Sequence, residues 1–234
     1  MIINVKRKST ESEQPPNFWI SYSDLLAGML LVFALLLIVA MSNFASFNER
    51  KKQLLSEQET KLKSFRALQE RLIGNLSEAM TDQNAQIDIE TGVLQIQSGI
   101  LFGEGESGLR SDASQRLYQI FDAYIKVILN DEFREFIKYI EIEGHTNSNG
   151  GYLYNLKLSQ ERALTIMRQL LDHASASDRQ MLEKMVVASG RAYSNLILDQ
   201  QGREDLIKSR RIEIKFRLKE SELFDDIYRE LVRE

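Results

Sequence analysis

The sequence predicts an α/β protein with a single N-terminal transmembrane helix, a helical stalk and a C-terminal α/β sandwich. An uncharged apolar run from Leu25 to Met41 predicts the membrane helix, and leucines at heptad-like spacing after it predict the stalk. From residue 85 onward, short alternating segments separated by amphipathic ones predict helices that cover one face of a small sheet. The predicted segments are a tail at 1–17, the membrane helix at 18–44, the stalk at 45–84, the sandwich at 85–218 and a last helix at 219–234.

Composition excludes several classes of protein. The chain has 234 residues, a net charge of -4, no cysteine and 2 histidines, which excludes disulfides, thiolate metal sites and multi-histidine metal sites. Acidic and basic residues interleave, without the basic stripe that nucleic acid requires. No nucleophile and base, and no pair of carboxylates, stand at catalytic spacing. We therefore expect no enzyme activity, no cofactor and no nucleic acid partner.

The apolar run is long enough to cross a membrane. From Trp19 to Phe44 it exceeds the roughly 20 residues that span a hydrocarbon core. A cleaved signal peptide is the competing interpretation, but large residues follow the run at Met41-Ser42-Asn43-Phe44, where small residues would mark a cleavage site. A buried helix of a soluble protein is disfavoured because the run is apolar on all sides. The sequence thus predicts a single-pass membrane protein.

The flanks of this helix do not orient it. The polar tail from Met1 to Asn17 ends at Pro15-Pro16. The basic residues nearest the span are Lys6, Arg7 and Lys8 on one side and Arg50, Lys51 and Lys52 on the other. Because the two flanks carry equal positive charge, the preference of basic residues for the cytoplasmic side favours neither orientation.

The stalk carries a narrow apolar seam. Between Ser46 and Asp82 there is no proline, and apolar residues recur at three-, four- and seven-residue steps. They are Leu55, Leu62, Phe65, Leu68, Leu72 and Leu76. Two interpretations stay open, a single solvated helix and two copies that pair along the seam as a coiled coil.

The remaining elements follow from changes in periodicity. Alternating segments on both sides of Thr91-Gly92 predict a hairpin. Further strands are predicted at 139–143, 185–188 and 212–216, and helices at 109–129, 156–172 and 221–234. Gly144 follows the first of these strands and is expected to let the chain turn, while Glu141 and Glu143 alternate along it and are expected to face solvent.

Asp24 is the residue whose position is physically expensive. A carboxylate inside a membrane helix costs about 3 kcal/mol, so such residues usually face a protein partner or water. The alternative is that Asp24 lies at the headgroup boundary, where Trp19 and Tyr22 are the aromatic residues expected. Five residues of helix place Asp24 only about 7 Å deeper than Trp19, so depth leaves both alternatives open.

The segment from Phe18 to Met29 resembles the start of the B subunit of ion-driven stator units, the MotB family. It has an aromatic residue, the triplet Tyr22-Ser23-Asp24 and then an apolar span. The resemblance implies that Asp24 binds and releases a translocated ion, H+ or Na+, at a pore that a pentamer of A subunits forms around a B-subunit homodimer. The TolR/ExbD type also has a membrane aspartate, but usually with a nearby proline, which this span lacks.

A second set of motifs is similar to the OmpA-like peptidoglycan-binding domain. The motifs occur in the family's order and cover nearly all of residues 86 to 218. They are Leu101-Phe102-Gly103-Glu104-Gly105, Ile140 to Asn147, Tyr154 to Ala163, Val187 to Gly190 and Ser209 to Ile214. The resemblance implies that Arg162 binds the free carboxylate of a diaminopimelate stem peptide through a bidentate fork.

The same resemblance assigns the other residues of that site. The implied peptidoglycan-binding residues are Thr146, Asn147, Tyr154, Asn155, Leu158 and Arg162. Asn155 and Ser159 are expected to order the loop and cap the helix, and His145 is expected to pack rather than to catalyse. The family usually has Asp at the position of Asn147, where it holds the ligand's ammonium group, so Asn147 drops the charge-assisted part of that contact.

Together the two resemblances imply an orientation and a function. Peptidoglycan lies outside the cytoplasmic membrane, so the tail is expected in the cytoplasm and residues 46 to 234 in the periplasm. The expected partners are a second copy, a pentameric MotA/ZorA-like membrane subunit and peptidoglycan. The Ser23-to-Met29 opening and the short tail look more like the ZorB group of Zorya anti-phage defence than like flagellar MotB. A flagellar stator subunit and a passive OmpA-like wall tether are the alternatives.

Overall fold

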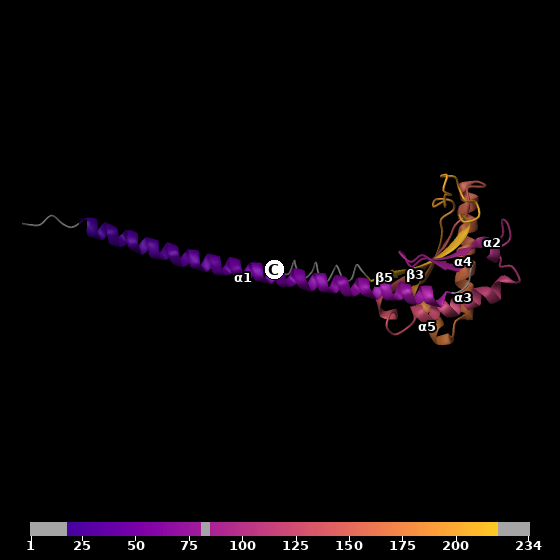
Figure 1. Cartoon of the computed structure of the whole chain (residues 1–234), viewed down its shortest axis with the longest axis horizontal. Coiled ribbons are helices and arrows are strands. Elements are labelled where there is room, and N and C mark those ends of the chain that lie inside the picture. The colour runs from indigo at the N-terminus through magenta and orange to yellow at the C-terminus, as the bar shows by residue number, and fades with distance from the viewer. Residues whose placement is uncertain (1–17, 81–84, 220–234) are drawn as a thin grey trace, which may run out of the picture. The chain divides into compact units, whose positions relative to one another are not determined.

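The computed structural model describes residues 18–80 and 85–219, and the chain divides into two compact units, Met1–Thr60 and Lys61–Glu234 (Figure 1). The predicted tail at 1–17 and the predicted helix at 221–234 lie outside the described residues. The long helix α1, Phe18–Ala79, contributes to both units.

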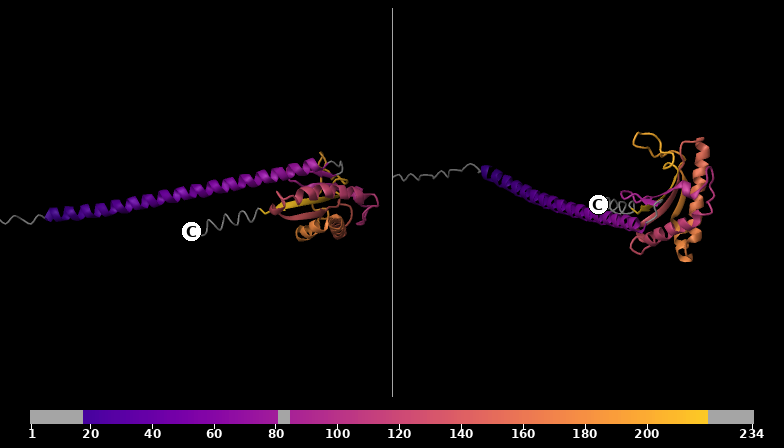
Figure 2. Two further views of the ribbon diagram at one scale, coloured as in Figure 1. Left: turned by 90° about the horizontal axis from the view of Figure 1, so that it is seen from below. Right: turned by 45° about the vertical axis from the view of Figure 1, so that its right-hand side comes forward.

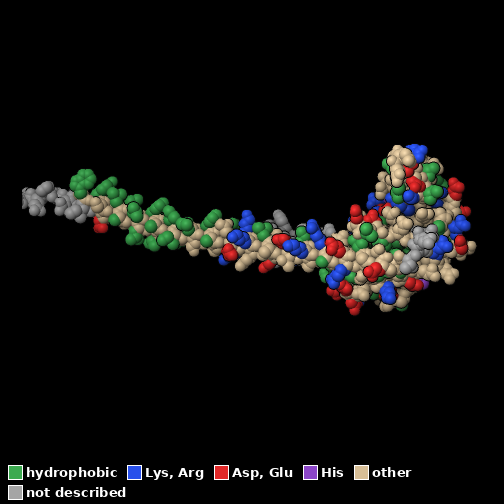
Figure 3. All heavy atoms as spheres, viewed as in Figure 1, with side chains coloured by type: hydrophobic (Ala, Val, Ile, Leu, Met, Phe, Trp, Pro, Cys, Tyr) green, Lys and Arg blue, Asp and Glu red, His purple; other side chains and the backbone are tan. Residues whose placement is uncertain are grey.

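In the first unit, α1 exposes its apolar side chains. Its most apolar 18 residues have a mean hydropathy of 2.8, and none of them is buried. On the face seen in Figure 3, hydrophobic side chains cover this part of the helix, and charged side chains become frequent only further along it. By length and composition, it is the one helix within the described ranges that could cross a membrane.

The second unit contains a five-stranded sheet in the order β1-β2-β5-β3-β4. The strands are β1 Ala85–Ile87, β2 Leu94–Gln97, β3 Ile137–Gly144, β4 Val186–Gly190 and β5 Arg211–Leu218. β1 and β2 form the predicted antiparallel hairpin, β5 pairs antiparallel with both β2 and β3, and β3 pairs parallel with β4. The three later strands overlap the segments at which alternation predicted them.

Helices of the second unit share one core with the sheet. They are α2 Ser98–Leu101, α3 Ala113–Ile128, the 3-10 helix η1 Arg134–Phe136, α4 Tyr152–His173 and α5 Ala176–Met185. α4 runs along β3 and β4 (Figure 2). Core residues alternate along the strands, as Ile140 and Ile142 do in β3 and Ile212 and Ile214 do in β5. The predicted class, an apolar N-terminal helix with a stalk and a C-terminal α/β sheet domain, is confirmed.

The end of α1 belongs to this core. Leu68, Leu72 and Leu76 are buried with the side chains of the sheet and of α3. This part of the predicted seam therefore packs within its own chain. Leu55 is exposed and Leu62 and Phe65 are half-buried, so a pairing of two copies has only the N-terminal part of the seam available.

Gly144 and Gly190 let α4 approach the ends of β3 and β4. A Cβ on Gly144 would lie 2.1 Å from the carbonyl oxygen of Ser159, and one on Gly190 would lie 2.5 Å from the backbone nitrogen of Gln160. Neither glycine has a positive φ. The expectation that glycine stands at position 144 to let the chain turn is therefore wrong. Glycine is required there because a side chain would collide with α4.

Candidate functional site

A pocket of about 130 Å³ lies beside the end of β3 in the second unit. It is lined by Glu104, Gly105, Thr146, Asn147, Asn149, Tyr154, Asn155, Leu158, Arg162 and Arg210. All six residues predicted for peptidoglycan binding are among them. Asp24, the predicted ion carrier, belongs to the other unit, where it is exposed on α1.

Two elements bring the six predicted residues together. β3 ends at Gly144, and the next residues carry Thr146 and Asn147 into the pocket. The first turns of α4 supply the others, Tyr154, Asn155, Leu158 and Arg162. Residues four apart on a helix share a face, which places Tyr154, Leu158 and Arg162 in one row. The close approach at Gly144 brings this face to the end of the strand.

Thr146 offers an unsatisfied hydroxyl group. Its backbone N–H donates to the carbonyl of Ala192 at 2.8 Å, which fixes the chain at the pocket wall. The side chain is buried, yet Oγ1 has no hydrogen-bond partner within the described part of the chain. A buried hydroxyl without a partner is costly, and a ligand that meets it recovers that cost.

Asn155 orders the loop at the pocket rim. Its Nδ2 donates to the carbonyl of Asn149 at 2.8 Å, while Asn147 Oδ1 accepts from the backbone N–H of Asn149 at 3.3 Å. Ser159 does not cap α4, which begins without a side-chain cap. Its Oγ instead accepts from the N–H of Ala192 at 3.0 Å, so it connects α4 to the segment after β4. The capping role expected of Ser159 is therefore wrong.

Arg162 is buried, with 4% of its surface exposed. Nε donates to the carbonyl of Glu106 at 2.8 Å and Nη2 to the carbonyl of Gly103 at 3.1 Å, and the guanidinium lies 5.2 Å from the centre of the Phe102 ring. These bonds use two of its five N–H donors, and the others remain for an anion. Burial and the neighbouring charge of Arg210 lower the pKa of Arg162, which keeps its charge at any physiological pH.

Sequence reasoning missed two charged residues of the pocket. Arg210 and Glu104 both line it, and each stood inside a quoted motif without receiving a role. Arg210 immediately precedes β5, and Glu104 lies in the loop after α2. Their position in a motif was a signal, but only the fold brings residues so far apart in sequence to one pocket.

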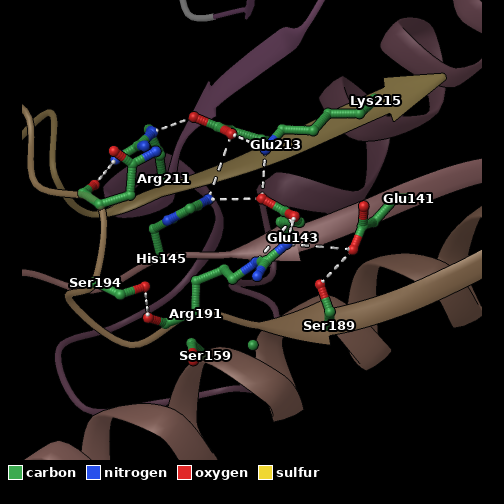
Figure 4. A network of polar contacts seen from close by, with 12 residues as sticks. Glu141, Glu143, His145, Ser159, Ser189, Arg191, Ser194, Arg211, Glu213 and Lys215 are labelled. Carbon is green, nitrogen blue, oxygen red and sulfur yellow. Dashed lines mark hydrogen bonds and ion pairs between the residues drawn. The ribbon is translucent and has the colours of Figure 1, made fainter. Parts of the chain in front are cut away.

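Charged side chains of β3 and β5, together with Arg191 after β4, form a network on the sheet (Figure 4). Glu143 of β3 accepts from Arg191, with Oε1 2.7 Å from Nη2, and its Oε2 accepts from Lys215 Nζ. Glu213 of β5 accepts from Arg211 at 2.6 Å and lies 2.7 Å from Lys215. Glu143 is only 2% exposed and Glu141 is half-buried, so the expectation that both face solvent is wrong. The segment after β4 supplies the Arg191 that covers them.

His145 stands between the two carboxylates. Its Nε2 lies 3.4 Å from an oxygen of Glu143 and 3.4 Å from an oxygen of Glu213, and within the described ranges neither ring nitrogen makes a hydrogen bond of ordinary geometry. The buried ring agrees with the packing role expected for it. Glu143, His145 and Glu213 lie close enough together to hold a metal ion, but the carboxylates are already paired with three cations, Arg191, Arg211 and Lys215. The arrangement is that of an internal ion-pair network.

These contacts set the ionisation of the carboxylates. Burial raises the pKa of Glu143, but the contacts with His145, Lys215 and Arg191 lower it by more, and the pKa ends well below its usual range. The pKa of Glu213 is lowered in the same way, against its burial, by His145, Lys215 and Arg211. Both groups are therefore anions at neutral pH.

The network fixes the segments that form the pocket. The backbone N–H of His145 donates to the carbonyl of Arg211 at 2.9 Å, and that of Arg191 donates to the carbonyl of Gly144 at 2.9 Å. His145 precedes Thr146 and Arg211 follows Arg210, and both Thr146 and Arg210 line the pocket. Arg191 precedes Ala192, whose carbonyl accepts from the backbone N–H of Thr146. The charge network and these backbone bonds thus fix the segments that carry Thr146 and Arg210.

Comparison with known proteins finds a family model that matches part of this chain and relatives that are similar over most of it. Residues 101–212 match the OmpA family. ZorB of Escherichia coli O139:H28 is 28% identical over 90% of this chain and 83% of its own length, and ZorB of a second Escherichia coli strain is 29% identical over 90% and 92%. YtxE of Bacillus subtilis, which is uncharacterised, is 24% identical over 88% of this chain and 90% of its own.

Solved structures with a similar chain path include two described as anchor or MotB-like proteins. The cell wall anchor of the T6SS from Pseudomonas aeruginosa is 22% identical, covers 62% of this chain and 95% of its own, and superposes with a TM-score of 0.42. A putative MotB-like protein from Desulfovibrio vulgaris is 20% identical, covers 68% and 99%, and superposes with a TM-score of 0.46.

Proposed function

We propose that this chain, whose residues 101–212 match the OmpA family and which is similar to ZorB over nearly its whole length, is a stator B subunit that anchors an ion-driven membrane motor to peptidoglycan. The pocket at the end of β3 carries this proposal. It combines two guanidinium groups with a buried hydroxyl that has no partner among the described residues. Such a pocket is suited to a small ligand with a carboxylate, as the stem peptides of peptidoglycan have.

The wall-binding part is tested with the full chain in detergent micelles. Arg162→Ala is expected to abolish co-sedimentation with purified peptidoglycan, because it removes the buried cation of the pocket. Arg168→Ala is the matched control, since Arg168 is an exposed arginine of the same helix that does not line the pocket. Co-sedimentation that survives the loss of Arg162 would overturn the assignment.

The membrane topology that fits this role has the N-terminus in the cytoplasm. The apolar part of α1 would cross the inner membrane once, and the sheet domain would lie in the periplasm, where peptidoglycan is. The two flanks of the span carry equal basic charge, so the topology rests on the proposed ligand.

Asp24 is proposed as the ion-carrying carboxylate. It is exposed on α1 at the start of the apolar run, and the cost of a charge there favours a position against a protein partner. Gly28 lies one turn further on the same face, and apart from its chain neighbours and the helix's own backbone no described residue lies within 4 Å of the place its Cβ would occupy. Small residues let transmembrane helices approach closely, which suits packing against a surrounding MotA/ZorA-like pentamer and a second copy of this chain.

Similarity to ZorB favours anti-phage defence as the output of the motor. A flagellar stator subunit is the second candidate, because the Tyr22-Ser23-Asp24 triplet is common to both groups. Phage plating and swimming motility of a deletion strain separate the two. A strain that loses motility and keeps its resistance to phage would favour the flagellar role.

A further inference from the structure

The residues that line the pocket include more cationic than anionic side chains, and these come from different segments of the chain. Arg162 of α4 and Arg210 before β5 supply two cations, and Glu104 supplies the one carboxylate among the residues that line it. Asn147 is neutral, and its Oδ1 already accepts from Asn149. An anionic group of a ligand thus has two partners, and a cationic group has a single charged partner, Glu104.

We infer that Glu104 binds the ammonium group of a zwitterionic ligand whose carboxylate is held by Arg162 and Arg210. The ligand class is the end of an amino acid that carries both groups, as the side chain of diaminopimelate does. This inference rests on the proposed function, because it concerns the same pocket. It assigns to Glu104 the charged contact that Asn147 does not supply.

The loop that carries Glu104 is fixed by the same arginine that meets the anion. Arg162 donates to the carbonyls of Gly103 and Glu106, the residues on either side of the turn at Glu104 and Gly105. Gly105 has a φ of +70°, a conformation that glycine adopts without strain, and the place of its Cβ lies 3.1 Å from the hydroxyl of Tyr154. Backbone anchors on both sides thus hold the turn that carries Glu104 beside the pocket before a ligand arrives.

Exposure of Glu104 supports a role in binding rather than in folding. The side chain is exposed, in contrast to the buried Arg162. A substitution of Glu104 is therefore expected to leave the core and the charge network around Glu143 and Glu213 intact. A ligand ammonium that approaches it is partly desolvated by the pocket walls, which strengthens the contact relative to one in open water.

The test compares ligands that differ in a single kind of group. Free meso-diaminopimelate and pimelate, the same carbon chain without amino groups, are titrated into the full chain in micelles by calorimetry. We expect the wild-type chain to bind diaminopimelate more tightly than pimelate. Glu104→Gln should lower the affinity for diaminopimelate by about tenfold, the usual effect of one lost charge-assisted contact, and leave the affinity for pimelate unchanged.

The control is Glu161→Gln. Glu161 accepts a hydrogen bond from Ser107 of the same loop at 3.3 Å but does not line the pocket, so both affinities should stay at the wild-type level. Equal binding of diaminopimelate by wild type and Glu104→Gln would overturn the inference, as would an equal loss for both ligands. The proposed function would still stand if Arg162→Ala lost co-sedimentation with peptidoglycan. It would fall separately if the wild-type chain did not sediment with peptidoglycan.

Discussion

Gly144 and Ser159 approach so closely that a Cβ on Gly144 would lie 2.1 Å from the carbonyl oxygen of Ser159. The contact joins the end of β3 to α4, the two elements that supply the predicted residues of the pocket. Because the obstacle is backbone, a side chain here can be accommodated only by moving the helix or the strand. The geometry of the pocket therefore depends on a missing methyl group.

Gly144→Ala is expected to lower the free energy of unfolding by about 3 kcal/mol and to weaken binding to peptidoglycan, because it separates Thr146 from α4. Thermal unfolding and co-sedimentation measure the two effects. Gly151→Ala is the control, since nothing lies within 4 Å of the place of its Cβ. A stable, fully binding Gly144→Ala chain would show that α4 can shift at no cost.

Thr146→Val replaces the unpartnered hydroxyl by a methyl group of the same shape. The free energy of unfolding should rise by about 1 kcal/mol, because a buried polar group without a partner is removed, while ligand affinity should fall. Ser98→Ala serves as the control, because Ser98 Oγ is also buried without a partner in the described part of the chain and does not line the pocket. It should raise stability and leave binding unchanged. Unaltered binding by Thr146→Val would mean that the ligand does not reach the hydroxyl.

The charge network predicts a stability that falls in acid. The pKa values of Glu143 and Glu213 are lowered in the folded chain from 4.5, so the unfolded chain takes up protons first as the pH decreases. Their contribution is complete above pH 4.5 and is lost progressively below it, toward the folded pKa values. Urea unfolding at a series of pH values measures this loss.

Glu143→Gln removes one of the two titrating groups and supplies the comparison. The variant should be less stable at neutral pH, since Lys215 and Arg191 lose a charged partner, but its stability should decline less steeply below pH 4.5. Parallel pH profiles for the two chains would argue against a lowered pKa of Glu143.

Asp24→Asn tests the proposed ion carrier. The amide keeps the size of the side chain but cannot bind and release a proton, so we expect loss of motor output, measured by phage plating, with normal membrane insertion and peptidoglycan binding. Asp24→Glu, which keeps the carboxyl group, should retain part of the output. Full activity of Asp24→Asn would leave the chain as a passive tether.

Strand positions, and six of the residues that line the pocket, could be predicted from the sequence, because alternation and ordered motifs are local signals. The burial of Glu143 could not, since it depends on Arg191 and Lys215, which reach it from other strands or the segments after them. Periodicity along β3 identifies two faces but not what covers the second one. Glu104 was missed for the same reason, as its role depends on a pocket assembled from distant segments.

The burial of Leu68, Leu72 and Leu76 bears on how this protein can be recombined with its relatives. In a chimera joined at β1, the leucines at the end of α1 would come from one protein and the core that they pack against would come from another. An exchange that carries the chain from Lys61 onward keeps the compact unit whole. Substitutions in the final turns of α1 and in the sheet are therefore expected to covary among homologues. This is expected even though the sequence of α1 there is typical of a stalk and that of the sheet is typical of a domain.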